Sequence, residues 1–282
     1  MNYNIVMSKY QGLGNDYLVI DPNKNRVQLK GKKIELLCKR GFGIGADGVL
    51  YGPLLENGKL GVRIFNADGT EAEISGNGVR IFAKYLMDQQ YVTTSKFSIE
   101  TIIGPVDVEC LNGRGTEFKI HMGKASFDSE DIPVLGDKRE VINEPFTFHG
   151  QEYKATCVSV GNPHCIIIMD EISKEKVKEL GPYVENDDLF PKRINLQICK
   201  VIDKFNVDIQ IYERGSGYTK ASGTGSCAVA AALYRMGLIE PRVNICQPGG
   251  NIEIDIDEDG NMYMLGTVGF IADVSIAESF FA

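Results

Sequence analysis

The sequence predicts a mixed α/β protein built from two similar halves. The chain has 282 residues, and domains usually hold about 100–200 residues, so two domains are expected. Short β-like runs alternate with a few stretches of helical spacing. The segment EISGNGVRIF, residues 73–82, has a close counterpart in KASGTGSCAV, residues 220–229, 147 positions later. A repeat at about half the chain length indicates two structurally similar halves.

The elements of the first half follow from hydrophobic spacing and turn residues. Residues 31–40 predict a short helix that ends at Gly41, and residues 76–90 predict a second helix with Val79, Phe82 and Leu86 at helical spacing. Runs rich in β-branched and aromatic residues, bounded by Gly or Asn-Asp turns, predict strands. These runs are residues 3–11, 16–21, 61–69, 97–111 and 117–123.

The second half repeats this order. Residues 173–184 predict an amphipathic helix, and residues 223–237 predict a helix of small side chains. Predicted strands occupy residues 152–170 (two strands around a tight turn), 194–202, 206–215 and 243–266 (a pair of hairpin strands). The polar region 123–140 is the predicted seam between the halves.

Composition narrows the class of protein. The net charge is −8 without a basic run, which argues against nucleic acid as a partner. No apolar stretch reaches the roughly 20 residues that cross a bilayer, and the N-terminus lacks a long apolar signal segment, so we expect a cytoplasmic protein with no membrane partner. The seven cysteines are scattered without a CxxC pair, which suggests buried thiols and neither a zinc site nor disulfides.

The doubled serine-glycine helix start carries the functional argument. A helix N-terminus offers unpaired N–H groups and the positive end of a dipole, and glycines let a ligand approach the backbone. Two such ends facing each other would hold one carboxylate, with Ser75 and Ser222 on opposite sides of it. The alternative is plain capping, because serine is a favoured N-cap residue.

Polar side chains gather near both copies. His164 and Glu213 are candidates for a general base or its orienting partner. Arg214 suits bidentate binding of a carboxylate. The remaining candidates are asparagines in turns or at strand ends: Asn15, Asn66, Asn162 and Asn195. Each residue also has a structural explanation, as a turn former, a packed histidine or a surface ion pair.

Six motifs in order resemble one known family. YQGLGNDY, GIGADG, FNADGTEAE followed by SGNG, VGNPHC, YERGSG and SGTGSCA resemble the motifs of the diaminopimelate epimerases over essentially the whole chain. The resemblance implies two pseudo-symmetric α/β (α+β) domains, each a curved, mostly antiparallel sheet around a central helix, with the active site in the interdomain cleft. It implies residues 1–125, joined by the C-terminal segment 268–282, as one domain and residues 126–267 as the other.

The resemblance also implies an activity and a set of roles. It implies a cofactor-independent, metal-free epimerase that interconverts LL- and meso-diaminopimelate, as in lysine biosynthesis, through two thiols on opposite faces of the α-carbon. The α-carboxylate would bind at Gly76, Asn77, Gly223 and Thr224, and His164 and Glu213 would lie beside the reacting centre. The far end of the substrate would contact Asn15, Asn66, Asn162, Asn195 and Arg214. The expected partner is a small amino acid, and a homodimer is left open.

The sequence departs from the family pattern at three positions. Both family cysteine positions are serines here, Ser75 and Ser222, and a hydroxyl is a far weaker acid than a thiol. The chain as written should therefore bind ligand but turn over very poorly, and we interpret it as a Cys-to-Ser double variant. Tyr218 stands where the family usually has Glu, which puts the substrate in question.

Three alternatives follow from these departures. The first alternative is a racemase of another amino acid such as histidine. The second is a non-catalytic amino-acid-binding homologue. The third is an isomerase of the same fold that uses carboxylate chemistry at Glu213 or Asp68.

Overall fold

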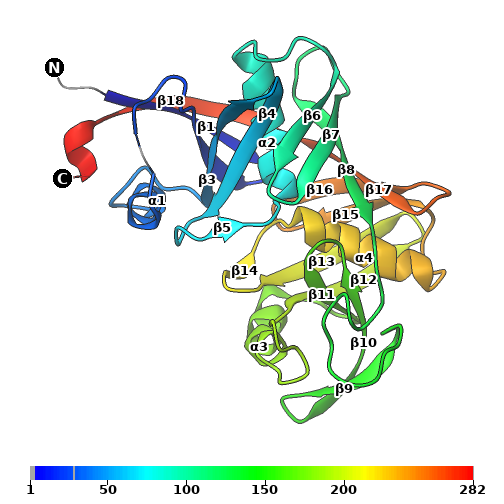
Figure 1. Ribbon diagram of the computed structural model, residues 1–282. Coiled ribbons are helices and arrows are strands. Elements are labelled where there is room, and N and C mark those ends of the chain that lie inside the picture. Colours follow the sequence, from blue (N-terminus) through cyan, green and yellow to red (C-terminus); the bar gives the residue numbers. More distant parts are fainter. Residues whose placement is uncertain (1–3, 28, 282) are drawn as a thin grey trace. The chain divides into compact units, whose positions relative to one another are not determined.

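The computed structural model describes residues 4–27 and 29–281 (Figure 1). Its contacts divide the chain into two compact units. Unit 1 holds Met1–Ile120 and Gly266–Ala282, and unit 2 holds His121–Leu265. The chain changes unit inside strands β8 (Glu117–Lys124) and β17 (Asn261–Thr267). The expected domain boundaries at residues 125/126 and 267/268 stay a prediction beside these units.

Unit 1 is a mostly antiparallel sheet with one long helix against it. Its strands pair in the order β18, β1, β2, β3, β4, β6, β7, β8, with the short β5 also on β4. Only β2–β3 and β4–β6 are parallel. Besides β8, the elements are β1 Asn4–Gly12, β2 Asn15–Ile20, α1 Gly31–Cys38, β3 Gly48–Glu56, β4 Lys59–Asn66, β5 Glu71–Ala72, α2 Gly76–Asp88, β6 Lys96–Thr101, β7 Gly104–Cys110, β18 Gly269–Ala277 and the 3₁₀ helix η1 Glu278–Phe281.

Unit 2 has the same pairing scheme. Its strands pair in the order β9, β10, β11, β12, β13, β15, β16, β17, with the short β14 also on β13. Here β11–β12 and β13–β15 are the parallel pairs. Besides β17, the elements are β9 Glu144–Phe148, β10 Gln151–Ser159, β11 Pro163–Ile168, α3 Lys174–Glu185, β12 Asn195–Asp203, β13 Asn206–Glu213, β14 Gly217–Thr219, α4 Gly223–Arg235, β15 Arg242–Gln247 and β16 Gly250–Ile256.

The strand register makes the repeat exact in its central part. In unit 1, Tyr17 pairs with Gly48, and in unit 2 the residues 147 positions later, His164 and Asn195, pair in the same parallel register. The antiparallel pairs β3–β4 and β12–β13 keep this offset. The two central helices keep it too and are equally long, 13 residues each. The repeat inferred from two short segments therefore extends through the strands around both helices.

A buried helix forms the centre of each unit. Every residue from Gly76 to Leu86 of α2 is buried, and so is every residue from Gly223 to Leu233 of α4. A helix that is buried all round lies inside its strands rather than on them. The shorter helices α1 and α3 are amphipathic and bury one face each, with Ile34 and Leu37 in α1 and Val177, Leu180 and Val184 in α3.

Most predicted elements are confirmed, and five strands were missed: β3, β9, β18 and the short strands β5 and β14. Strand β3 contains the Gly52-Pro53 pair and β9 contains Pro145, and both residues weaken a strand pattern in sequence. Strand β18 was also not assigned, although it pairs along nearly all of β1. Of the seven cysteines, all but the half-buried Cys246 are buried, as expected. No helix within residues 4–27 and 29–281 is long and apolar enough to span a membrane.

Candidate functional site

The start of α2 is a serine-capped helix end. Ser75 has extended backbone angles, φ −140° and ψ 112°, and its Oγ accepts a hydrogen bond from the Gly78 N–H at 3.0 Å. A helix start leaves its first N–H groups without helical carbonyl partners. Since Oγ takes the Gly78 N–H, the N–H groups of Gly76 and Asn77 are the ones left for a ligand.

A chain of amides and charges holds Asn77 and Asn15 together. Asn77 Nδ2 donates to Asn15 Oδ1 at 3.2 Å, and Asn15 Nδ2 donates to Asp47 Oδ2 at 2.9 Å. Asp47 pairs with Arg40 at 2.9 Å, and Arg40 also pairs with Asp16. The guanidinium of Arg40 and the ammonium of Lys9 hold the pKa of Asp16 below its usual range, against the effect of burial. The glycine-rich segment between Arg40 and Asp47 is thus fixed at both ends.

Arg80 is a functional candidate that the sequence analysis missed. Its side chain is fully buried under the start of α2, and Nη2 donates to Asn77 Oδ1. A Cβ on Gly266 would lie 3.0 Å from the guanidinium carbon, so glycine is required there. The signal was available, because Arg80 lies between Val79 and Phe82 on the apolar side of a predicted helix. An arginine in that place must find buried polar partners.

Asn66 occupies the turn between β4 and β5. Its Nδ2 donates to Thr70 Oγ1 at 3.0 Å, and its backbone N–H donates to the Thr70 carbonyl at 2.8 Å. Asp68 in the same turn accepts from the Thr70 N–H and hydroxyl, at 2.9 and 2.6 Å. The two side chains therefore shape the turn, and Asp68 is exposed.

The start of α4 repeats the capping geometry of α2. Ser222 has φ −141° and ψ 120°, and its Oγ accepts from the Gly225 N–H at 3.1 Å. The N–H groups of Gly223 and Thr224 correspond to those of Gly76 and Asn77. The Ser222 N–H donates to Gln247 Oε1 at 2.8 Å, a support that the sequence analysis missed. The capping interpretation is thus correct for both serines, and it leaves the anion-binding interpretation open.

His164 is fully buried and belongs to a polar network beside this helix start. Its Nε2 is 2.9 Å from Asn162 Oδ1, and its Nδ1 is 2.9 Å from the Gln197 side-chain amide. Asn162 Nδ2 in turn donates to Thr224 Oγ1 at 3.4 Å. The network therefore connects the histidine on β11 with the first turn of α4.

Burial keeps His164 neutral. The pKa of His164 is lowered to about 4, mainly by desolvation; the hydrogen bond with Gln197 opposes this effect, and the positive charge of Arg214 adds to it. A neutral imidazole donates from one nitrogen only, so it donates to one of the two amide oxygens that face it, Asn162 Oδ1 or Gln197 Oε1.

Asn195 is a brace between two loops. Its Nδ2 donates to the Pro163 carbonyl at 2.7 Å, and its Oδ1 accepts from the Arg214 N–H at 2.9 Å. The structure thus uses this buried side chain to position the segment after β13, where Glu213 and Arg214 lie. Arg214 Nη1 donates to the Lys192 carbonyl at 3.0 Å, which leaves its other N–H groups for a carboxylate.

The buried Glu185 fixes the other side of this segment. It accepts from the Gly215 N–H at 2.8 Å and forms an ion pair with Arg193 at 2.9 Å. Glu185 ends helix α3, so this helix positions the Glu213-Arg214 segment. Sequence gave no signal for this role, since the contact joins residues 30 positions apart.

Tyr218 packs against helix α3. It pairs with Tyr212 across the β13–β14 ladder, and both rings pack against the core that includes the apolar face of α3. Lys174 Nζ of α3 lies 5.2 Å from the centre of the Tyr218 ring. The Tyr218 hydroxyl donates to Gln210 Oε1 at 3.4 Å. The phenol is thus part of the contact with α3.

The cysteines near the motifs are structural. Cys165 and Cys227 are fully buried. Cys165 pairs with Cys157 across β10–β11, and the hydrogen bond between the two thiols, together with burial, raises the pKa of Cys157 well above its usual value. The described residues include no group of three or more His, Cys, Asp or Glu that could hold a metal ion.

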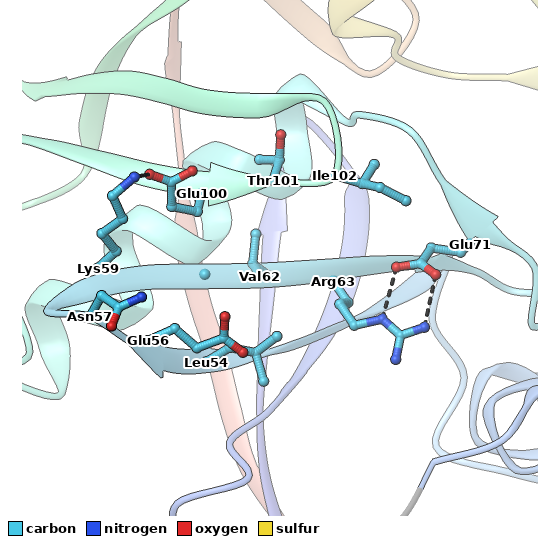
Figure 2. A pocket seen from close by; sticks show the side chains of 11 residues that line it. Leu54, Glu56, Asn57, Lys59, Val62, Arg63, Glu71, Glu100, Thr101 and Ile102 are labelled. Carbon is cyan, nitrogen blue, oxygen red and sulfur yellow. Dashed lines mark hydrogen bonds and ion pairs between the residues drawn. The ribbon is translucent and has the colours of Figure 1, made fainter.

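Unit 1 also has a surface groove that contains none of the predicted site residues. Figure 2 shows its walls from β3, β4 and the β6–β7 turn, with the ion pairs Lys59–Glu100 (2.6 Å) and Arg63–Glu71 (2.8 Å) across it. Glu56 also lines the groove, so the two ion pairs and this carboxylate together give the lining a net charge of −1.

Comparison with known proteins identifies the family. The model of the diaminopimelate epimerase family matches residues 7–127 and 156–271. The chain belongs to the diaminopimelate epimerase family. It is 44% identical to "Diaminopimelate epimerase 2" of Nostoc sp. over 97% of this chain and 96% of that protein. It is 38% identical to the diaminopimelate epimerase of Methanothermobacter thermautotrophicus over 95% and 97%.

Solved structures share the fold at low identity. A hydroxyproline epimerase from Agrobacterium vitis, with bound trans-4-hydroxy-L-proline, matches with a TM-score of 0.72 at 12% identity, over 99% of this chain and 94% of that one. A phenazine biosynthesis protein of the PhzF family from Bacillus anthracis matches with a TM-score of 0.66 at 14% identity, over 97% and 99%. These neighbours place the chain in a fold used by isomerases, and membership in the diaminopimelate epimerase family makes it a member of an isomerase family.

Proposed function

We propose that this chain is a diaminopimelate epimerase scaffold in which serines replace both proton-transferring thiols. In this proposal it binds LL- and meso-diaminopimelate and exchanges the α-proton very slowly. The observation that carries the proposal is the pair of helix starts at residues 75 and 222, which share one capping geometry and one place in the repeat. The family's names supply the substrate.

The proposed binding mode assigns the α-carboxylate to the two helix starts. The N–H groups of Gly76, Asn77, Gly223 and Thr224 would donate to it, and the two positive dipole ends would stabilise the negative charge that develops when the α-proton leaves. The capping hydroxyls leave these N–H groups free, which supports the assignment.

The proposed acid–base chemistry needs thiols at positions 75 and 222. A thiolate on one face takes the α-proton, and the electron pair of the broken C–H bond is held next to the carboxylate. A thiol on the other face then gives its proton to the carbon. A helix start lowers the pKa of a thiol, whereas a serine hydroxyl stays protonated. His164, neutral in its buried network, would orient Asn162 and Thr224 rather than remove the proton itself.

The far end of the substrate is assigned to charged and amide groups. Arg214 would take the distal carboxylate with the N–H groups that Lys192 does not use. Glu213, at the end of β13, would pair with an amino group.

The test restores both thiols. Ser75→Cys combined with Ser222→Cys should exchange the α-proton of LL-diaminopimelate with solvent deuterium and form the meso isomer, followed by NMR and by chiral chromatography. The parent chain should exchange at least about 10³-fold more slowly, as expected when general acid–base groups are lost. A matched control places two thiols on exposed serines, Ser95→Cys with Ser275→Cys, and should not restore exchange.

Each outcome decides between the alternatives. Exchange of histidine or another amino acid, without diaminopimelate, would refute the substrate and keep the two-thiol mechanism. A folded double variant that exchanges no amino acid would refute the enzymatic proposal.

A non-catalytic binding protein is the second candidate. The observation in its favour is that both serines form well-built N-caps, a role that serine fills in its own right. Calorimetric binding of diaminopimelate by the parent, without exchange after both thiols are restored, would select it.

A further inference from the structure

Tyr17 reaches the side chain at position 75 from strand β2. Its hydroxyl oxygen lies 3.2 Å from Ser75 Oγ, within hydrogen-bond distance, and the Tyr17 side chain is buried. Among the described residues, the other hydrogen bond to Ser75 Oγ comes from the backbone of its own helix, the Gly78 N–H. Tyr17 is therefore the side chain that meets the capping group.

The place of Tyr17 is built into the sheet. Tyr17 pairs with Gly48 across the parallel β2–β3 ladder. A Cβ on Gly48 would lie 2.6 Å from Cε1 of the Tyr17 ring and 2.4 Å from the Phe65 carbonyl oxygen. The ring therefore lies directly over the glycine, and this contact directs the hydroxyl toward the start of α2.

The repeat gives Tyr17 a counterpart in unit 2 with different hydrogen-bond partners. The residue at the same register in unit 2 is His164, and there the partner strand presents Asn195 in place of Gly48. His164 directs its ring nitrogens to Asn162 and Gln197, while the Oγ of Ser222 receives a hydrogen bond from the Gly225 N–H within its unit. The capping atoms of the two helix starts thus differ: among the residues that the structure describes, only Ser75 Oγ has a side-chain hydroxyl within hydrogen-bond distance.

The number of donors decides what this hydroxyl does to a thiol. Between a serine hydroxyl and a phenol, either group can be the hydrogen-bond donor. A thiolate has no proton to donate, so both the Gly78 N–H and the Tyr17 O–H must donate to it. Hydrogen bonds to the charged form of an acid lower its pKa.

We propose that Tyr17 is a positioning residue that donates a hydrogen bond to the side chain at position 75 and stabilises the anionic form of a thiol placed there. The proposal rests on the proposed function in one respect, that position 75 carries a proton-transferring thiol in the active form. It makes the two thiols of that form unequal: the thiol at position 75 ionises at lower pH than the thiol at position 222.

The test measures thiol ionisation without any substrate. The pKa of the new thiol in Ser75→Cys is read from its ultraviolet thiolate absorbance, as a difference from the Ser75 parent at the same pH, so that the seven native cysteines cancel. The same difference is taken between Tyr17→Phe proteins with Cys and with Ser at position 75. Loss of the phenol hydroxyl should raise the thiol pKa by about one unit.

Two controls separate this effect from a general disturbance of unit 1. Tyr91→Phe removes another hydroxyl of the same unit, one that donates to Asp21 at 2.8 Å, and should leave the thiol pKa unchanged. Tyr17→Phe in the Ser222→Cys protein should also leave the thiol at position 222 unchanged. The pH dependence of alkylation at position 75, located by peptide mass analysis, gives a second measurement of the same pKa.

An equal pKa with tyrosine or phenylalanine at position 17 would overturn the proposal. So would an equal shift in the Tyr91→Phe control, because the effect would then be general. The titration does not depend on catalysis. A failure of deuterium exchange in the double thiol variant would therefore refute the proposed function and leave the role of Tyr17 intact.

Discussion

The starts of α2 and α4 have the same backbone geometry, but different side chains lie beneath them. A Cβ on Gly78 would lie 3.2 Å from Leu50, and a Cβ on its counterpart Gly225 would lie 2.9 Å from Gln197 Nε2. Leu50 and Gln197 occupy the same register, two residue pairs along the ladder from Tyr17 and His164 and therefore on the same sheet face. Unit 1 therefore supports its helix start with an apolar side chain and a phenol, and unit 2 with an amide and an imidazole.

This difference separates capping from chemistry. Both helix starts need serine or a similar small side chain and two glycines, because the N-cap geometry and the close contacts with the strand below are equal in both units. The ionisable and polar residues around them are not repeated. Arg80 lies under α2, whereas the corresponding residue of α4 is the buried Cys227. A duplicated backbone can thus carry two unlike sets of side chains.

The largest expected effect concerns the space under Tyr17. Gly48→Ala places a Cβ against a carbonyl oxygen and the tyrosine ring, neither of which can move freely, and should lower the free energy of unfolding by about 3 kcal/mol. Urea unfolding measures it. In Gly113→Ala, where no heavy atom lies within 4 Å, the change should stay within about 0.5 kcal/mol. A Gly48→Ala protein as stable as the parent would show that the ring does not lie over Gly48.

The second effect comes from the protonation of His164 in acid. Its counterpart in unit 1, Tyr17, takes up no proton there. Unfolded histidine binds a proton below about pH 6.5, and buried His164 binds one only near pH 4, so the unfolded state holds more protons between these values. The free energy of unfolding should therefore fall as the pH falls through this window, by about 3 kcal/mol from this group.

The comparison of three proteins isolates the contribution of His164. Unfolding is followed from pH 7 to pH 4 in the parent, His164→Gln and Tyr17→Phe. In His164→Gln, the free energy of unfolding should depend less on pH, by the contribution of one proton. Tyr17→Phe should keep the pH dependence of the parent, because a phenol does not change charge in acid. Equal slopes in the parent and His164→Gln would contradict a buried, neutral histidine.

The smallest effect concerns the two caps themselves. Ser75→Ala and Ser222→Ala should each lower the free energy of unfolding by about 1 kcal/mol, because each removes the acceptor for a first-turn N–H. Ser173→Ala, which uncaps α3, provides a cap of the same kind away from both sites. Exposed Ser95→Ala should change little. An unchanged stability in both cap variants would mean that these hydroxyls do not cap their helices.

Local sequence features determined the repeat, the helices and the family of this protein. Helical spacing, serine N-caps and glycine turns act within a few residues, so their signals can be read directly, and the six motifs mark the chain positions of the candidate site. The strands with internal proline, β3 and β9, were missed because proline weakens the same local signal.

Only the tertiary structure decided what surrounds each candidate residue. The alternation of side chains along a strand gives two faces, and sequence could not say that Tyr218 takes the face toward α3. The hydrogen bond of His164 joins it to Gln197, which is 33 positions away, and the link between Tyr17 and Ser75 spans 58 positions. Such contacts arise from strand pairing and packing between distant segments, and no local pattern in the sequence encodes them.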